Sequence, residues 1–81
     1  MDRIYIKEKI MSLLHMISNN HKEIDLSINY HLINELGMTS IVFVYLLLKL
    51  EDEFSIEINN VAFLDIVTLD DLVELIESKI L

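Results

Sequence analysis

A run of eight consecutive apolar residues, Ile41 to Leu48, restricts the fold of this chain more than any other feature. The run is too short to cross a membrane as a helix, which takes about 20 apolar residues. It is also apolar all round, whereas an ordinary surface helix has one apolar face and one polar face. A helix formed by this run is therefore either buried on two sides or exposes an apolar face to a binding partner.

The composition of the chain favours an all-α fold. The 81 residues include no proline, no cysteine and a single glycine, Gly37, so the residues that usually form tight β-turns are nearly absent. The absence of cysteine excludes disulfide bonds, a cysteine-based zinc site and a thiol nucleophile. A hydrophobic content of 53% is enough for a packed core, and the length suits one domain that spans residues 1–81.

Four helical segments are predicted. The first begins after Asp2, a suitable N-cap. The second runs from about residue 40 to residue 53, and a short third helix of one or two turns is expected within residues 61–66. The fourth follows a capping box made by Thr68 and Asp71, in which Asp replaces the usual Glu. Helical spacing predicts core positions at Ile6, Ile10, Leu13, Leu14 and Ile17 in the first helix, and at Leu69, Leu72, Val73, Ile76 and Ile80 in the fourth.

A long connection separates the first two helices. It spans about 20 residues, from 20 to 39, which is unusual in a compact domain unless the segment is itself packed or functional. Apolar residues occur throughout this connection, so we expect it to pack across the helices. These residues are Ile24, Leu26, Ile28, Leu32, Ile33 and Leu36.

The charge distribution excludes several kinds of partner. The net charge of −8 arises after residue 34, where ten acidic residues are accompanied only by Lys49 and Lys79. Nucleic acids and anionic membrane surfaces are not expected as partners, because both require a basic patch. A basic patch on another protein is favoured instead. The N-terminal segment mixes charged and apolar residues and has no signal-peptide pattern, so a cytoplasmic protein is expected.

No metal site and no catalytic site are predicted. Residues 25–36 carry oxygen ligands at alternate positions, but Tyr30 and Leu36 stand where a calcium loop needs glycine and glutamate. The three histidines do not have the spacing of metal ligands. Composition does not exclude a serine–histidine–acid triad, but a helical chain of this size leaves little room for a substrate pocket.

The second predicted helix has two apolar faces. The first can hold the helix against a core and consists of Phe43, Leu46, Leu47, Leu50 and Phe54. The second has the same spacing and consists of Ile41, Val44, Tyr45, Leu48 and Asp52. Either the long connection covers this second face, or the face is exposed as a contact surface for a partner.

Ser40, at the start of this helix, has two interpretations. Serine and threonine are favoured N-caps, so Thr39 or Ser40 could simply close the helix start. Alternatively, the Ser40 hydroxyl is presented to solvent just past a flexible glycine, Gly37. A phosphate ester formed there would lie against free backbone N–H groups and the positive end of the helix dipole. Helix chemistry alone favours neither interpretation.

Three motifs at fixed spacing resemble the acyl and peptidyl carrier protein family. They are LGMTSI at residues 36–41, LEDEFSIEI at residues 50–58, and the pattern formed by Phe63, Thr68, Leu69 and Leu72. Together they cover nearly the whole chain. The resemblance implies a small four-helix bundle of the acyl-carrier-protein type, with a long first loop and a short third helix.

The resemblance also implies a function. A separate phosphopantetheinyl transferase would attach 4′-phosphopantetheine from coenzyme A to Ser40, with Mg²⁺ needed only during that step. The thiol of the arm would carry an acyl or aminoacyl group as a thioester, and the protein would have no catalytic activity of its own. In some members acyl chains lie near the positions of Leu46 and Phe63. Loading enzymes and downstream synthase enzymes would recognise Met38, Thr39, Ile41, Val44, Tyr45, Leu48, Glu51, Asp52 and Glu53.

Two departures from the family pattern bear on the finer function. Thr39 stands where the family usually has aspartate, and a hydroxyl is a poorer Mg²⁺ ligand than a carboxylate, which bears on which transferase accepts the chain. Tyr45 and Lys49 occupy positions where acidic or small residues are common. They favour a stand-alone carrier of a specialised polyketide or nonribosomal peptide pathway over housekeeping fatty-acid synthesis. A monomer is expected. The alternative is an unmodified helical interaction module in which Ser40 is only an N-cap.

Overall fold

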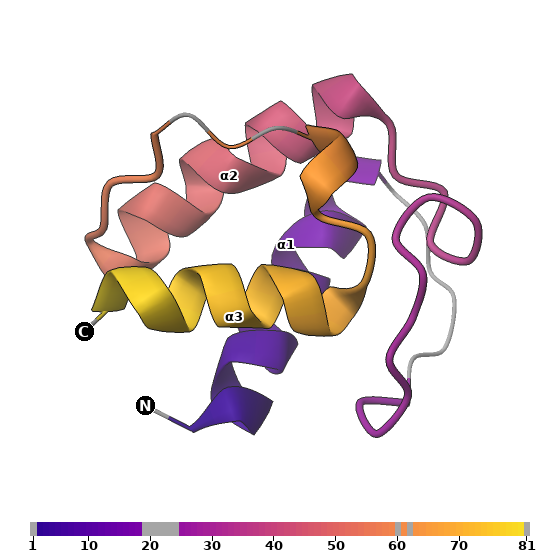
Figure 1. Cartoon of the computed structure of the whole chain (residues 1–81), viewed down its shortest axis with the longest axis horizontal. Coiled ribbons are helices and arrows are strands. Elements are labelled where there is room, and N and C mark those ends of the chain that lie inside the picture. The colour runs from indigo at the N-terminus through magenta and orange to yellow at the C-terminus, as the bar shows by residue number, and fades with distance from the viewer. Residues whose placement is uncertain (1, 19–24, 60, 62, 81) are drawn as a thin grey trace.

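The structure is a computed structural model that describes residues 2–18, 25–59, 61 and 63–80. Within these residues the all-α class is confirmed. The described helices are α1 (Arg3–Ser18), α2 (Ser40–Phe54) and α3 (Leu69–Ile80), with one turn of 3-10 helix, η1 (Phe63–Asp65). The turn η1 lies beside the first half of α2, and the connection before α2 runs along the end of the bundle where α3 begins (Figure 1).

The predicted four-helix bundle needs one correction. In the described part of residues 61–66 the backbone forms only the 3-10 turn, which is closed by a hydrogen bond of 3.2 Å from Ile66 N–H to Phe63 C=O. The next residue, Val67, donates its N–H to the carboxylate of Asp71, and its C=O accepts a hydrogen bond from Leu32. Because these hydrogen bonds hold the backbone of Val67 at the start of α3, the described residues do not form a fourth α-helix.

The first helix begins where the sequence predicts. The Asp2 carboxylate accepts a hydrogen bond of 3.0 Å from Ile4 N–H, which satisfies one of the free donors of the first turn. Met11, which was not among the predicted core positions, is 4% exposed. Leu13 and Ile17, which were among them, are only partly buried at the edge of the core. The buried residues of α1 are therefore Ile6, Ile10, Met11 and Leu14.

One side of α2 is buried, and it is the side that the spacing predicts. Phe43, Leu46 and Leu50 are at most 1% exposed, whereas Leu47 and Phe54 lie at the edge of the core and stay partly exposed. Each fully buried side chain of this size stabilises the fold by about 1.5–3 kcal/mol. These three residues make α2 the central element of the core.

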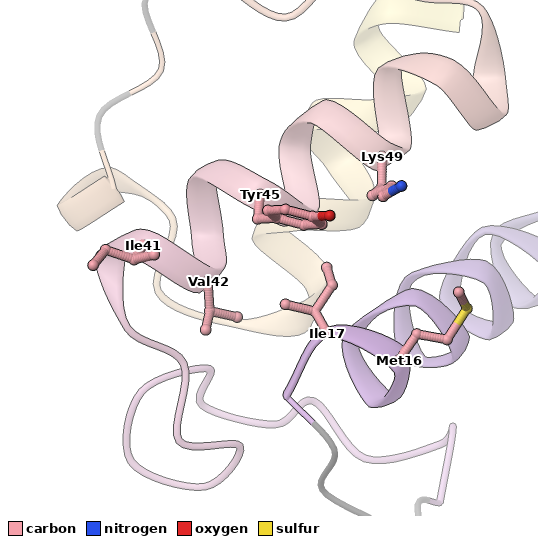
Figure 2. A pocket seen from close by; sticks show the side chains of 6 residues that line it. All are labelled: Met16, Ile17, Ile41, Val42, Tyr45 and Lys49. Atoms are coloured by element: carbon pink, nitrogen blue, oxygen red, sulfur yellow. The ribbon is translucent and has the colours of Figure 1, made fainter.

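Ring and aliphatic contacts at both ends show that α1 and α2 run antiparallel. Near the start of α1, Tyr5 meets Phe54 at the end of α2 with ring centroids 6.2 Å apart and ring planes at 86°. Near the end of α1, Ile17 faces Val42 and Tyr45 of α2 (Figure 2). The end of α1 therefore lies beside the beginning of α2.

The fourth predicted segment, α3, starts with the predicted capping box. Asp71 Oδ2 accepts hydrogen bonds of 3.0 Å from the N–H groups of Thr68 and Val67, and Thr68 Oγ1 accepts one of 3.2 Å from Asp71 N–H. Three donors at the start of the helix are thereby satisfied. The buried residues of α3 are Leu69, Leu72, Val73 and Ile76, while Ile80 is half-buried.

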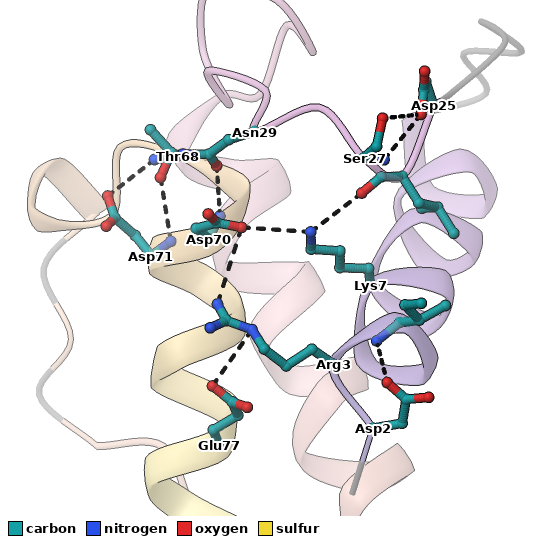
Figure 3. A network of polar contacts seen from close by, with 12 residues as sticks. Asp2, Arg3, Lys7, Asp25, Ser27, Asn29, Thr68, Asp70, Asp71 and Glu77 are labelled. Carbon is teal, nitrogen blue, oxygen red and sulfur yellow. Dashed lines mark hydrogen bonds and ion pairs between the residues drawn. The ribbon is translucent and has the colours of Figure 1, made fainter.

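The described part of the long connection packs against the start of α3, as expected. Leu32 N–H donates to Val67 C=O at 2.9 Å, and Leu69 N–H donates to Tyr30 C=O at 2.9 Å. Asn29 Oδ1 accepts a further hydrogen bond of 2.8 Å from Asp70 N–H (Figure 3). Leu32 and Leu36 are buried, whereas Ile28 and Ile33 are exposed. The predicted packing position Ile24 lies outside the described residues.

Charged side chains of α1 reach the same end of α3. Lys7 Nζ lies 3.6 Å from Asp70 Oδ1 and donates to Leu26 C=O at 3.2 Å, so one ammonium group joins α1, the connection and α3 (Figure 3). Arg3 lies 4.0 Å from Asp70 and 3.8 Å from Glu77. Exposed ion pairs of this kind each contribute little stability. They supplement the backbone hydrogen bonds that hold the connection against the start of α3.

The capping box makes stability depend on pH. Hydrogen bonds from the backbone N–H groups of Thr68 and Val67 lower the pKa of Asp71 below its ordinary value of 3.8. The contribution of this carboxylate is therefore fully present above pH 3.8 and is lost as the pH falls through the lower folded-state pKa. We expect Asp71→Asn to reduce the free energy of unfolding at neutral pH by about 0.5–1 kcal/mol.

Urea unfolding of both proteins at neutral pH and in acid measures this effect, since the difference should shrink in acid as wild-type Asp71 becomes protonated. Asp65→Asn is the matched control, because Asp65 is exposed in η1 and makes no side-chain hydrogen bond within the described residues. A difference between wild type and Asp71→Asn that is the same at both pH values would contradict the assignment.

Candidate functional site

The segment before α2 is a turn with a defined conformation. Gly37 has φ +67°, in the left-handed region that costs other residues about 1–2 kcal/mol. A Cβ atom there would contact nothing within 4 Å, so the backbone conformation alone favours glycine. Gly37 N–H donates to Ile33 C=O at 3.1 Å, and Met38 N–H donates to Leu32 C=O at 2.9 Å. The glycine expected as a flexible joint is thus part of a hydrogen-bonded turn.

Thr39 is the N-cap of α2. Its backbone is extended, with φ −108° and ψ 169°, and its Oγ1 accepts a hydrogen bond of 3.2 Å from Val42 N–H. Its C=O accepts the N–H of Phe43 at 2.8 Å. Ser40 is the first helical residue, so the interpretation in which Ser40 caps the helix is wrong.

The Ser40 hydroxyl is available for chemistry. Ser40 is exposed, and its Oγ makes no hydrogen bond within the described part of the chain. The first turn of α2 contains no acidic side chain that would repel an anion. The positive end of the helix dipole and the first backbone N–H groups favour negative charge at this position. An exposed hydroxyl that makes no hydrogen bond in the described residues suits a phosphodiester attachment at this position.

The second apolar face of α2 is exposed to solvent. The exposed fractions are 80% for Ile41, 57% for Val44, 50% for Tyr45 and 59% for Leu48. The described part of the long connection therefore does not cover these four residues, which we call the exposed α2 face. Together with Ser40 they line a shallow hollow of about 350 Å³. The hydroxyl of Ser40 is thus continuous with an apolar surface.

Met38 does not belong to that surface, although the resemblance places it among the recognition residues. It is 2% exposed and forms part of the core with Leu36 and Leu32. The turn at Gly37 directs the chain so that Met38 packs inward while Thr39 and Ser40 remain exposed. A partner enzyme could not contact its side chain without opening the core.

The three acidic residues near the end of α2 differ in their surroundings. Glu51 is half-buried, and its Oε2 accepts a hydrogen bond of 2.8 Å from Ile58 N–H. Glu53 pairs with Lys9 of α1 at 2.7 Å, and this hydrogen bond raises the pKa of Lys9. Asp52 is exposed and makes no ion pair or hydrogen bond within the described residues. Only Asp52 has its whole charge free for a partner.

A second hollow lies between α1 and the exposed α2 face. It has a volume of about 440 Å³ (Figure 2). The contribution of Met16 to this hollow was not predicted. Met16 lies outside the apolar stripe of α1, and the neighbouring sequence does not indicate which residues of other helices lie beside it. Lys49 stands at one end, with Nζ 5.5 Å from the centroid of the Tyr45 ring. The lining residues are Met16, Ile17, Ile41, Val42, Tyr45 and Lys49.

The resemblance associates acyl chains with the region of Leu46 and Phe63. Leu46 is fully buried, and the Phe63 ring packs on Phe43 with centroids 5.1 Å apart. Among the described residues no three metal-ligating side chains gather in one place. None of the described helices has the length and hydropathy needed to span a bilayer.

Comparison with known proteins gives one positive result. The family model described as the phosphopantetheine attachment site matches residues 5–76, a region that contains all of α2. Neither the curated proteins nor the solved structures yield a match.

The different roles of Thr39 and Ser40 can be measured. Thr39→Ala removes the side-chain acceptor of the cap and should lower the free energy of unfolding by about 1 kcal/mol. Ser40→Ala removes an exposed hydroxyl without a described partner and should change it by less than about 0.5 kcal/mol. Urea unfolding of the unmodified protein provides both values. A larger loss for Ser40→Ala than for Thr39→Ala would contradict the cap assignment.

Proposed function

Because the chain belongs to the phosphopantetheine attachment site family, we propose that it is a carrier protein whose 4′-phosphopantetheine is attached at Ser40. The observation that carries this proposal is the free, exposed hydroxyl at the first position of α2, within the matched region. Two other serines use their hydroxyls inside the chain: Ser27 donates to Asp25 at 2.6 Å, and Ser78 donates to Leu75 C=O at 2.7 Å.

The attachment reaction exchanges a phosphoanhydride bond of coenzyme A for a phosphate ester bond to the serine. The Ser40 oxygen forms a bond to the phosphorus that bears pantetheine, the pyrophosphate bond of coenzyme A breaks, and the adenosine bisphosphate half leaves. The serine proton passes to a base of the transferase or to water. In the product, the phosphodiester charge lies at the positive end of α2. The attached arm supplies a thiol that carries an acyl or aminoacyl group as a thioester.

The chain itself acts by tethering and by being recognised. The exposed α2 face offers apolar contacts next to Ser40, and Tyr45 is of a residue type that often dominates binding energy. Thr39 and Asp52 lie exposed at the two ends of α2, and Glu51 and Glu53 add acidic charge at its end. With a net charge of −8, this surface would steer basic partner patches towards the serine.

The partners we propose are a phosphopantetheinyl transferase, an acyl- or aminoacyl-loading enzyme and downstream synthase enzymes. Tyr45 and Lys49 on α2 support a stand-alone carrier of a polyketide or nonribosomal peptide pathway. We further propose that it acts as a single-domain monomer in the cytoplasm. The alternative of an unmodified interaction module cannot assign the N-cap role to Ser40, because Thr39 occupies that position.

The attachment site is tested by intact mass. Incubation of the protein with coenzyme A, Mg²⁺ and a broad-specificity transferase should add the mass of one phosphopantetheine. Ser40→Ala should add none, because the only proposed nucleophile is removed. Ser12→Ala is the matched control, since Ser12 is exposed in the middle of α1, and it should be modified like wild type. Modification that persists in Ser40→Ala would refute the site, and no modification of wild type by several transferases would refute the carrier function.

The residue before the serine should control the rate of this reaction. Thr39→Asp keeps a side chain that caps α2 and adds a carboxylate, a better Mg²⁺ ligand than a hydroxyl. We expect faster modification by a generic transferase, most clearly at low Mg²⁺ concentration, in a time course followed by mass. Thr39→Asn is the control because it caps the helix without adding charge. An unchanged or slower rate for Thr39→Asp would show that the metal argument does not apply to this chain.

A further inference from the structure

A hydrogen-bonded turn at residues 32–36 lies shortly before α2, and His31 closes its start. The His31 C=O accepts hydrogen bonds from Glu35 N–H at 2.9 Å and from Leu36 N–H at 3.2 Å. The Nδ1 atom of the His31 ring accepts a third, 3.1 Å long, from Asn34 N–H. In return, Glu35 Oε1 accepts the His31 N–H at 2.7 Å. This reciprocal pattern is that of a capping box, with histidine as the cap and the glutamate one residue later than usual.

The capped turn fixes the segment that leads to Ser40. Met38 N–H donates to Leu32 C=O at 2.9 Å, which ties the residue two positions before Ser40 to the first residue of the turn. Leu32 N–H donates to Val67 C=O at 2.9 Å, so the turn is also attached to the start of α3. Leu32 and Met38 are buried, whereas Ser40 is exposed. The cap therefore supports the segment that determines where α2 and its serine begin.

A histidine cap differs from a serine cap because it can gain a proton. Since Nδ1 of His31 accepts the Asn34 N–H, this atom carries no hydrogen in the capped turn. Histidine ordinarily gains a proton between roughly pH 8 and pH 5, and both ring nitrogens are then donors. Protonation of His31 would remove the acceptor of the cap. It would also place a positive charge against the positive start of the turn, which opposes the closed arrangement.

No neighbouring group replaces the His31 ring as the cap. Glu35 uses its Oε1 atom for the His31 N–H, and Asp71 accepts the N–H of Thr68, the residue that pairs with His31 in an isolated β-bridge. His31 forms no ion pair within the described residues, and no other described side chain accepts the Asn34 N–H. The titratable groups of the surrounding elements are Tyr30 and Glu35 of the connection, Asp70 and Asp71 of α3, and Lys7 of α1, which pairs with Asp70.

From this arrangement we propose that His31 is a pH-sensitive positioning residue for the attachment reaction at Ser40. With a neutral ring, the cap is closed and the turn holds the start of α2 in the arrangement that a transferase meets. With a protonated ring, the cap is lost and the turn opens more often, so Ser40 is modified more slowly. This inference rests on the proposed attachment at Ser40. The cap of α2 at Thr39 is a separate interaction and does not titrate.

The first test measures the turn in the unmodified protein by amide hydrogen exchange. NMR follows exchange at about pH 7.5 and about pH 5.5, on either side of the ordinary titration of histidine. After correction for the intrinsic pH dependence of exchange, the protection of the Asn34 and Met38 amides should fall in acid by about two- to fivefold, as expected for the loss of one cap. His31→Asn keeps an acceptor at the cap but does not titrate, so its protection should not fall.

Two further variants control the exchange measurement. His31→Ala has no acceptor at the cap, so the protection of the Asn34 and Met38 amides should be low at both pH values. Restoration of protection by His31→Asn shows that the acceptor, and not the bulk of the ring, is what the turn requires. His15→Asn is the matched control, because His15 is half-buried in α1, and it should lose protection in acid like wild type.

The second test links the turn to the reactivity of Ser40. Equal amounts of wild type and His31→Asn compete in one mixture with coenzyme A, Mg²⁺ and a broad-specificity transferase, and intact mass separates the two products. The pH dependence of the transferase cancels, because both proteins share the enzyme. The rate of wild type relative to His31→Asn should fall to about one half at the lower pH. Competition between wild type and His15→Asn should give the same ratio at both pH values.

Each outcome decides a different step of the inference. Protection of the Asn34 and Met38 amides that falls equally in wild type and His31→Asn would overturn the role of His31 as a titrating cap. A rate ratio that does not change with pH would overturn its role at Ser40. Absence of the arm from every protein at both pH values would instead refute the attachment, and the exchange data would still confirm or contradict the cap.

Discussion

The elements packed around α2 bury only one of its sides, and this limit determines the rest of the structure. Phe43, Leu46 and Leu50 face the core, which is completed by residues of α1 and α3. The opposite side remains exposed although it is equally apolar, with Ile41 80% exposed. A small domain has too little chain to cover a central helix completely. The apolar run that looked too hydrophobic for a surface helix therefore has one side in the core and one side exposed to solvent.

In the turn that leads into α2, the adjacent residues Thr39 and Ser40 have different roles. Gly37 adopts a positive φ angle, Met38 turns into the core, and Thr39 caps the helix. Ser40 is thereby relieved of any structural hydrogen bond in the described residues and keeps an accessible hydroxyl. Because Thr39 supplies the cap, Ser40 can be modified without loss of the interaction that starts the helix. Under the proposed function, stability and modification would depend on different side chains.

The helix caps were predicted well, because the residues that form each cap lie only a few positions apart in the sequence. Asp2 begins α1, and Thr68 with Asp71 begins α3, as short-range capping rules require. Features that depend on distant partners were not predicted. The segment around η1 stops short of an α-helix because Val67 bonds to Leu32 of the connection, and Glu53 pairs with Lys9 of α1. Met38 looked like a recognition residue until the turn at Gly37 placed it in the core.

The sequence by itself determined the all-α class, the helix starts, the two faces of α2 and the family to which the motif around Ser40 points, because periodicity, capping and motif spacing are local properties. Only the tertiary structure decided which of Thr39 and Ser40 caps the helix and whether the second face of α2 is exposed. It also decided that Met16 and Ile17 of α1 stand across from Tyr45 and Lys49. These outcomes depend on how α1, η1 and the long connection pack around α2, and no local pattern encodes that arrangement.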